Sequence, residues 1–204
     1  TNRQLRPTSN DVHFAVMTSG YNSVTNGFIL NSLKMVLNYI EKDEIQMIHY
    51  PDFFEEGYKH KYDKDIYHYL DNVASGNQYE MDRGFCHRLL RCSVVVWQFK
   101  NIGELVAKYN EVINILENSY DGEINTPDIQ QLKGMVREFE EELVWAYNGV
   151  QVSNVHHLHL GFYKDRGITK GPNMERDVMP ILNQFREIQP DIISVTLDPE
   201  GSGP

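Results

Sequence analysis

The sequence predicts an α/β fold, a three-layer Rossmann-like parallel sheet with a helical insertion at about residues 28–120. Two helix-then-strand patterns follow each other in the C-terminal half, over residues 126–160 and 174–197. A further apolar strand pattern stands near the start, over residues 11–17. Successive αβ units of this kind form parallel sheets with helices on their faces.

Each of these strand patterns ends in a loop of small, polar or acidic residues. Open α/β sheets bind their ligands at the carboxyl ends of the strands. We therefore expect Met17, Leu160 and Leu197 to end side by side on one edge of the sheet, with their loops forming a binding site.

Composition narrows the classes of function. The chain has 204 residues, of which 41% are hydrophobic, and this is enough for one sizeable core. We expect a single, partial domain over residues 1–204. A formal charge of −10 argues against a nucleic-acid partner or an anionic membrane, because phosphate binding needs clustered Lys and Arg. No apolar run approaches the roughly 18–20 residues of a membrane span, and the start is no signal peptide, so we expect a cytoplasmic protein.

The first strand, over residues 11–17, is followed by Thr18, Ser19 and Gly20. A glycine lets the backbone turn or approach a ligand closely, so these three residues are candidates for substrate binding. A plain connection between a strand and a helix is the alternative.

The proposed insertion consists of amphipathic helices. Apolar residues recur at helical spacing from residue 28 to residue 42, and again from 82 to 118 with a break near residues 101–103. Cys86 and Cys92 are poorly spaced for a disulfide and make no zinc motif, so we expect reduced thiols in the core.

The first helix-then-strand pattern begins with Thr126 as N-cap and Pro127 at the first helical position. Its helix stops near Gly149, and residues 150–160 have strand character. The second helix-then-strand pattern, a helix over residues 174–188, leads into the strand that begins at Pro190.

Several polar residues near the strand ends are candidates for function. His157 and His159 project to the same side of a strand, which suits either two metal ligands or packing against a helix, and we favour packing. Tyr163 and Asp198 lie nearer the expected edge and are candidates for substrate contact. Asp198 would otherwise ligate a metal or cap its turn.

Taken together, these segments resemble the PIG-L/LmbE-like de-N-acetylases, a family of zinc-dependent enzymes. The resemblance rests on the order and spacing of motifs that are weak alone, and it covers about half of the chain. It is closest to the version of this domain that is fused to a glucosamine-6-phosphate deaminase-like domain. The motifs are Thr18-Ser19-Gly20, Gln130-Gln131-Leu132-Lys133-Gly134, Arg137-Glu138-Phe139-Glu140 through Gly149-Val150, Val155 to Asp165 with Leu160-Gly161-Phe162-Tyr163, and Pro190-Asp191-Ile192-Ile193-Ser194-Val195-Thr196.

The resemblance implies removal of acetyl from an N-acetylglucosamine-type sugar. Zinc would acidify a bound water and polarise the acetyl carbonyl, an Asp would take the proton, and Arg137 would bind substrate or organise the pocket. The family's metal ligands and base come from a His-Pro-Asp-Asp segment and a later His. This sequence contains no His-Pro-Asp-Asp and ends where the later His is due, so it supplies no metal ligand of that set.

We therefore expect part of a zinc-dependent N-deacetylase that takes an amino sugar, with the missing ligands outside this segment. A non-catalytic carbohydrate-binding or interaction domain is the alternative. In a third interpretation the chain is a regulatory or scaffolding domain, and its helical insertion is the surface of a homo-oligomer.

Overall fold

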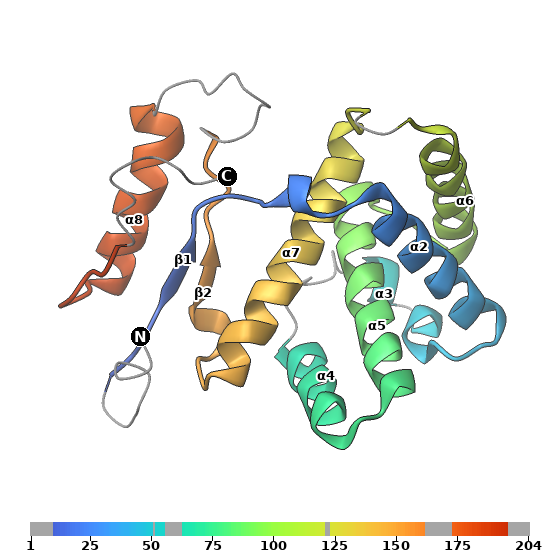
Figure 1. Ribbon diagram of the computed structural model, residues 1–204, viewed down its shortest axis with the longest axis horizontal. Helices are drawn as coiled ribbons and strands as arrows, with labels where there is room; N and C mark the ends of the chain where they lie inside the picture. Colours follow the sequence, from blue (N-terminus) through green and yellow to red (C-terminus); the bar gives the residue numbers. More distant parts are fainter. Residues whose placement is uncertain (1–9, 51, 56–62, 121–122, 162–172, 196–204) are drawn as a thin grey trace. The chain divides into compact units, whose positions relative to one another are not determined.

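The computed structural model describes residues 10–50, 52–55, 63–120, 123–161 and 173–195, and these residues are mostly helical (Figure 1). Contacts divide the chain into two compact units, Thr1–His157 and Leu158–Pro204. The predicted three-layer Rossmann-like sheet is wrong, because the described residues contain a single two-stranded sheet.

Helices make up the bulk of the first unit. Except for the helix over residues 63–75, which the sequence patterns did not predict, the longer ones match the helical spacing of the sequence, including the break between residues 97 and 102. They are α2 (Asn26–Glu41), α4 (Asp63–Ser75), α5 (Gln78–Trp97), α6 (Ile102–Asn118) and α7 (Pro127–Tyr147); the short elements are η1 (Tyr21–Ser23), η2 (Gln46–His49), α3 (Asp52–Glu55) and η3 (Val152–Asn154).

Side-chain caps fix where three of the helices begin. The Oγ1 atom of Thr25 accepts a hydrogen bond from the Phe28 amide at 3.1 Å, and Asn101 does the same for Glu104 at 3.0 Å. Asn77 caps α5 through the Glu80 amide at 3.3 Å. Each cap satisfies a backbone N–H that has no partner within the helix.

The core of the first unit lies among α2, α5, α6 and α7. In Figure 1, α5 lies between α2 and α7, and it contacts both. Within this core the Ser93 hydroxyl and the Tyr109 hydroxyl are hydrogen-bonded at 2.8 Å, so both buried polar groups are satisfied. The buried apolar residues include Ile29, Leu33, Val36, Leu89, Leu90, Leu105, Val112, Ile129 and Leu132.

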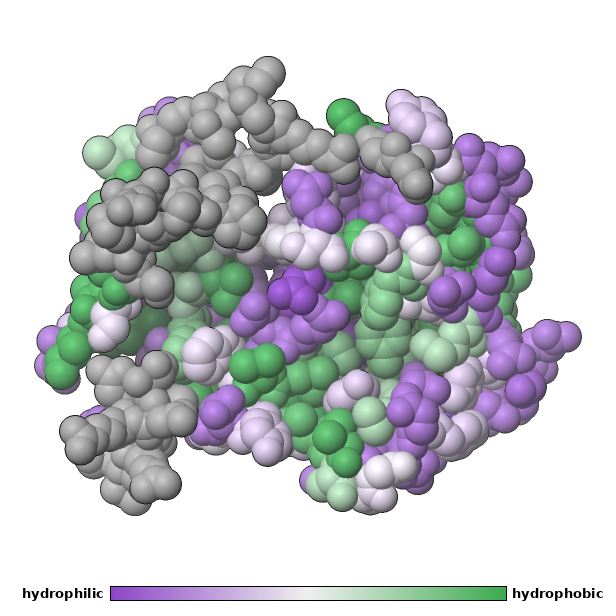
Figure 2. All heavy atoms as spheres, in the orientation of Figure 1, coloured by the Kyte–Doolittle hydropathy of each residue, from purple (hydrophilic) through white to green (hydrophobic). Residues whose placement is uncertain are grey.

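The outer side of α2 and α6 is polar. Figure 2 shows hydrophilic residues gathered along the right-hand edge, over these two helices. There the Lys34 ammonium pairs with the Glu117 carboxylate at 2.5 Å, with both side chains about half exposed. No helix of the described ranges is long and apolar enough to span a bilayer.

The sheet consists of β1 (Phe14–Val16) and β2 (Val155–His157). The two strands are parallel, with Phe14 opposite Val155 and Val16 opposite His157. The prediction that the first and second strand patterns lie parallel and adjacent is therefore confirmed for these residues.

The third predicted strand is wrong over its described part. Residues 192–195 have no strand assignment, and the Ile192 and Val195 residues are 80% and 66% exposed. An apolar β-branched run becomes a strand only when a neighbouring strand pairs with its backbone, and here the run pairs with neither β1 nor β2. Leu197 lies outside the described residues.

The second unit contains η5 (Met174–Val178), a π-helical turn, and α8 (Met179–Ile188). The helix predicted over residues 174–188 is confirmed. The Asp177 carboxylate accepts hydrogen bonds from the amides of Gly161 and Asn173 at 2.7 and 2.8 Å, and it pairs with Arg176. Hydrogen bonds from Arg176 are the largest cause that lowers the pKa of Asp177 far below its usual value.

Candidate functional site

A pocket of about 210 Å³ opens in the first unit at the carboxyl ends of β1 and β2. Its walls come from the loop after β1, from one face of α7 and from the end of β2. The lining residues are Val16, Thr18, Ser19, Gly20, Ser23, Arg137, Glu138, Glu141 and His157. Four of the six residues expected from sequence to bind substrate therefore lie around one pocket.

Two glycines allow the loop of residues 18–20 to lie close against α7. Gly20 has φ of +61°, a left-handed conformation that costs a residue with a Cβ atom free energy. A Cβ atom on Gly134 would lie 3.3 Å from the Ser19 Cβ atom, tighter than ordinary van der Waals contact. The loop and the helix can approach this closely because both positions are glycine.

Arg137 contributes from α7. A Cβ atom on Gly20 would lie 3.4 Å from the Arg137 Cγ atom, so the stem of this side chain packs beside the glycine. The guanidinium pairs with Glu140, one turn away, and lies 3.7 Å from the Glu141 carboxylate. These ion pairs favour one orientation of the guanidinium, and Arg137 lines the pocket.

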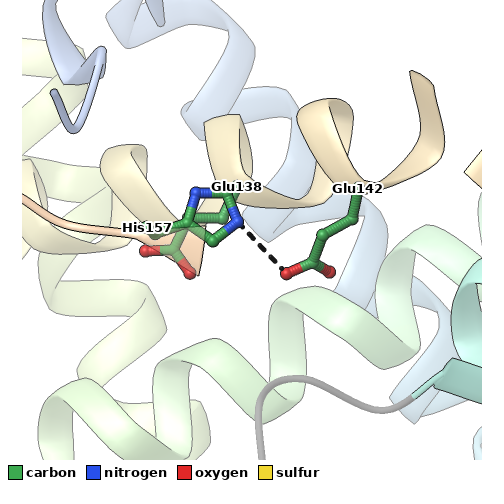
Figure 3. Close-up of side chains that lie close together, drawn as sticks. All are labelled: Glu138, Glu142 and His157. Carbon is green, nitrogen blue, oxygen red and sulfur yellow. Dashed lines mark ion pairs between the residues drawn. The ribbon is translucent and has the colours of Figure 1, made fainter. Parts of the chain in front are cut away.

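Behind these residues three potential metal ligands converge. Figure 3 shows Glu138 and Glu142 projecting from neighbouring turns of α7 toward His157, which comes from β2. One donor atom from each of the three residues lies within 4.8 Å of the others. His157 Nε2 is 3.4 Å from Glu142 Oε1, and the side chains of His157 and Glu142 are 5% and 0% exposed.

Arg88 of α5 completes this buried group of charges. Its Nη1 atom lies 2.9 Å from Glu142 Oε2, so the two oxygens of Glu142 face different partners. Burial alone would lower the pKa of Arg88, but Cys92 and Glu142 raise it on balance, which keeps the guanidinium charged. The charged pair compensates part of the cost of burying each ion.

The donors of this group are chemically suited to a divalent transition metal. Carboxylate oxygens and an imidazole nitrogen are ligands that Zn²⁺ takes in proteins. The three residues are not those of the His-Pro-Asp-Asp set that the N-deacetylase resemblance implies, so they fit zinc by their chemistry and not by the family's motif.

The remaining candidates are placed differently. Tyr163 and Asp198 lie outside the described residues. β2 ends at His157, and His159 has φ of +49°, so the strand geometry that would put both imidazoles on one face does not extend to His159. His156 instead meets His13, the residue before β1, with 2.9 Å between His156 Nε2 and His13 Nδ1 and the rings stacked.

Sequence reasoning missed Glu138, Glu142 and Arg88. A signal for the first two was present, because they stand four residues apart on either side of Phe139, within the apolar stripe of α7. Carboxylates at that spacing project from one helix face. Their convergence with His157 depends on how α7 packs against β2, which sequence spacing alone does not reveal.

One comparison with known proteins finds a relative of this chain. No family model matches the chain, and no solved structure matches it. The chain is 37% identical, over 109 residues, to a protein of Bacteroides thetaiotaomicron named as glucosamine-6-phosphate deaminase-like. The similarity covers 51% of this chain and 16% of that protein, so the chain matches about a sixth of its relative's length.

Proposed function

We propose that this chain forms the sugar-binding wall of a zinc-dependent amide hydrolase that removes acetyl from an N-acetylglucosamine-type sugar. One observation carries the proposal: residues 18–20 and Arg137, distant in sequence, line the same pocket. The relative named as glucosamine-6-phosphate deaminase-like supports an amino sugar as ligand.

The lining residues offer the hydrogen bonds that a sugar needs. The hydroxyls of Thr18 and Ser19 both donate and accept, and the Arg137 guanidinium donates to a hydroxyl, a phosphate or a carboxylate. A pocket of about 210 Å³ is smaller than the roughly 300–1,000 Å³ of sites for drug-sized ligands. It therefore suits one sugar ring and not an oligosaccharide.

In the proposed hydrolysis, a bound zinc ion would lower the pKa of a water to near neutrality and would polarise the acetyl carbonyl. The residues of this chain would hold the sugar ring: Arg137 fixes one polar substituent, and Thr18 and Ser19 orient the hydroxyls. Because residues 1–204 contain no His-Pro-Asp-Asp, hydrolysis by the family's route would take that set of ligands from elsewhere.

The absence of His-Pro-Asp-Asp from residues 1–204 also favours a second candidate function. In that case the chain is a carbohydrate-binding domain without catalysis. Both candidates predict sugar binding at Arg137. They differ in acetate release, which the binding domain would not support.

Sugar binding, which both candidate functions predict, is tested by calorimetric titration of the chain with glucosamine 6-phosphate and N-acetylglucosamine 6-phosphate. We expect saturable binding that Arg137→Met weakens at least tenfold, because the guanidinium hydrogen bonds are lost. Arg186→Met, an exposed arginine of α8, is the matched control and should bind as the wild type does.

Acetate release then separates the two candidates. It is measured with N-acetylglucosamine 6-phosphate and the full-length gene product, with and without its Arg137→Met substitution. Release that depends on Arg137 supports the hydrolase, whereas sugar binding without release identifies the binding domain. Failure of the wild-type chain to bind either sugar overturns both.

A further inference from the structure

We propose that Glu138, Glu142 and His157 bind one divalent transition-metal cation at the inner end of the pocket. The proposal goes beyond sugar binding and does not depend on it. It concerns ligands of this chain itself, which differ from the His-Pro-Asp-Asp set.

The backbone arrangement presents the three donors from two rigid elements. Glu138 and Glu142 are four residues apart on α7, so their side chains project from the same helix face. His157 is the last residue of β2, which is held by its pairing with β1 and by contacts with α7. Ligands on a helix and a paired strand are held more precisely than ligands on loops.

The distances between donor atoms suit a shared cation. Two ligands bound tetrahedrally to zinc at about 2.0–2.2 Å lie roughly 3.3–3.5 Å apart. His157 Nε2 and Glu142 Oε1 are 3.4 Å apart, within that range. Glu138 offers an oxygen within 4.8 Å of both, so all three donors face one small volume.

Arg88 orients the ligand at the centre of the group. Its Nη1 atom binds Glu142 Oε2 at 2.9 Å, while Glu142 Oε1 faces His157. A metal-binding carboxylate is commonly oriented by an outer partner of this kind, which leaves its other oxygen for the cation. Arg88 is itself buried, so the ion pair is shielded from water.

The pocket gives the cation an open side. Glu138 and His157 line the pocket together with residues 18–20 and Arg137, so a water or a small ligand could occupy the remaining coordination position. Three protein ligands with one open position are typical of catalytic rather than structural zinc sites. Imidazole with two carboxylates favours Zn²⁺, Fe²⁺ or Mn²⁺ over Ca²⁺ and Mg²⁺, which prefer oxygen ligands alone.

The competing explanation is a buried ion pair between His157 and Glu142 that has no metal function. Titration of the EDTA-treated chain with Zn²⁺, without sugar, separates the two. We expect one Zn²⁺ per chain and at least tenfold weaker binding in Glu138→Gln and His157→Gln. Glu141→Gln is the matched control, because Glu141 lines the same pocket but lies near Arg137, and it should bind as the wild type does.

A spectroscopic measurement on the wild type keeps the proposal testable should a substitution unfold the chain. In the chain labelled with ¹⁵N-histidine, Zn²⁺ should shift the imidazole nitrogens of His157 and leave those of His13 and His49 unchanged. The proposal is overturned if the wild type binds no cation, if His157 is not perturbed, or if folded Glu138→Gln and His157→Gln retain wild-type affinity. Sugar binding measured in EDTA remains a separate test of the proposed function.

Discussion

Arg88 and Glu142 form an ion pair in the interior of the first unit, with 2.9 Å between Arg88 Nη1 and Glu142 Oε2. The guanidinium comes from α5 and the carboxylate from α7, so the pair joins the two helices beside His157, which lines the pocket.

Glu142→Gln should destabilise the chain by about 3–5 kcal/mol, because it leaves the Arg88 charge buried without its carboxylate. Denaturant unfolding at neutral pH measures the change. Glu117→Gln, which breaks the exposed pair with Lys34, is the matched control and should cost less than about 1 kcal/mol. Equal effects in the two variants would contradict the importance of burial.

Gly20→Ala should weaken amino-sugar binding more than its effect on stability suggests. The left-handed backbone at Gly20 costs an alanine roughly 1 kcal/mol, and the new Cβ atom lies beside Arg137. Gly76→Ala is matched to it, because Gly76 also has a positive φ but a Cβ atom there meets nothing within 4 Å. Thermal melts should show similar losses for both variants, and calorimetry should show weaker sugar binding only for Gly20→Ala.

Stability should fall as the pH is lowered from about 6.5 to about 4 because of His87. Burial, with smaller contributions from Arg83 and Arg91, lowers the pKa of His87 from 6.5 to about 4. In that window the unfolded chain binds the proton and the folded chain does not, so the free energy of unfolding decreases with falling pH. The loss is at most about 3 kcal/mol, at about 1.4 kcal/mol per pKa unit.

His87→Gln should remove this part of the pH dependence. The measurement is denaturant unfolding of both proteins at pH 7, 5.5 and 4.5. If the substituted chain loses as much stability on acidification as the wild type, His87 is not the cause.

Cys86 and Cys92 should not react with thiol reagents in the folded chain. Both are buried and free, and burial is the largest cause that raises their pKa to about 12 and about 11. Thiolate is the reactive form, so at pH 8 we expect labelling with Ellman's reagent only after denaturant is added. Rapid labelling of two thiols in native buffer would contradict the packing of α5.

The helices could be predicted because their signals are local. Residues such as Ile29, Leu33 and Val36 follow the helical period, and Asn101 marks the break between α5 and α6 with a cap. The parallel pairing of β1 with β2 was also predictable, because a helical region separates the two strand patterns and a helical crossover joins parallel strands. The helices depend on residues close in sequence. The strand pairing depends on a right-handed crossover, which parallel strands share.

The sheet as a whole could not be predicted, because pairing is decided by partners distant in sequence. Ile192, Ile193 and Val195 have the composition of a buried strand and are exposed instead. The buried group of Arg88, Glu138, Glu142 and His157 was missed for the same reason. Charged residues usually lie on the protein surface, so their sequence pattern did not predict burial. These four residues come together only when α5, α7 and β2 pack against one another.

The close approach of Ser19 to Gly134 makes the two sides of the pocket mechanically dependent on each other. The loop after β1 packs directly against α7, so a ligand that displaces Ser19 toward Gly134 would press on the helix that carries Glu138. Ligand contact on one wall of the pocket would in this way reach a carboxylate on the other.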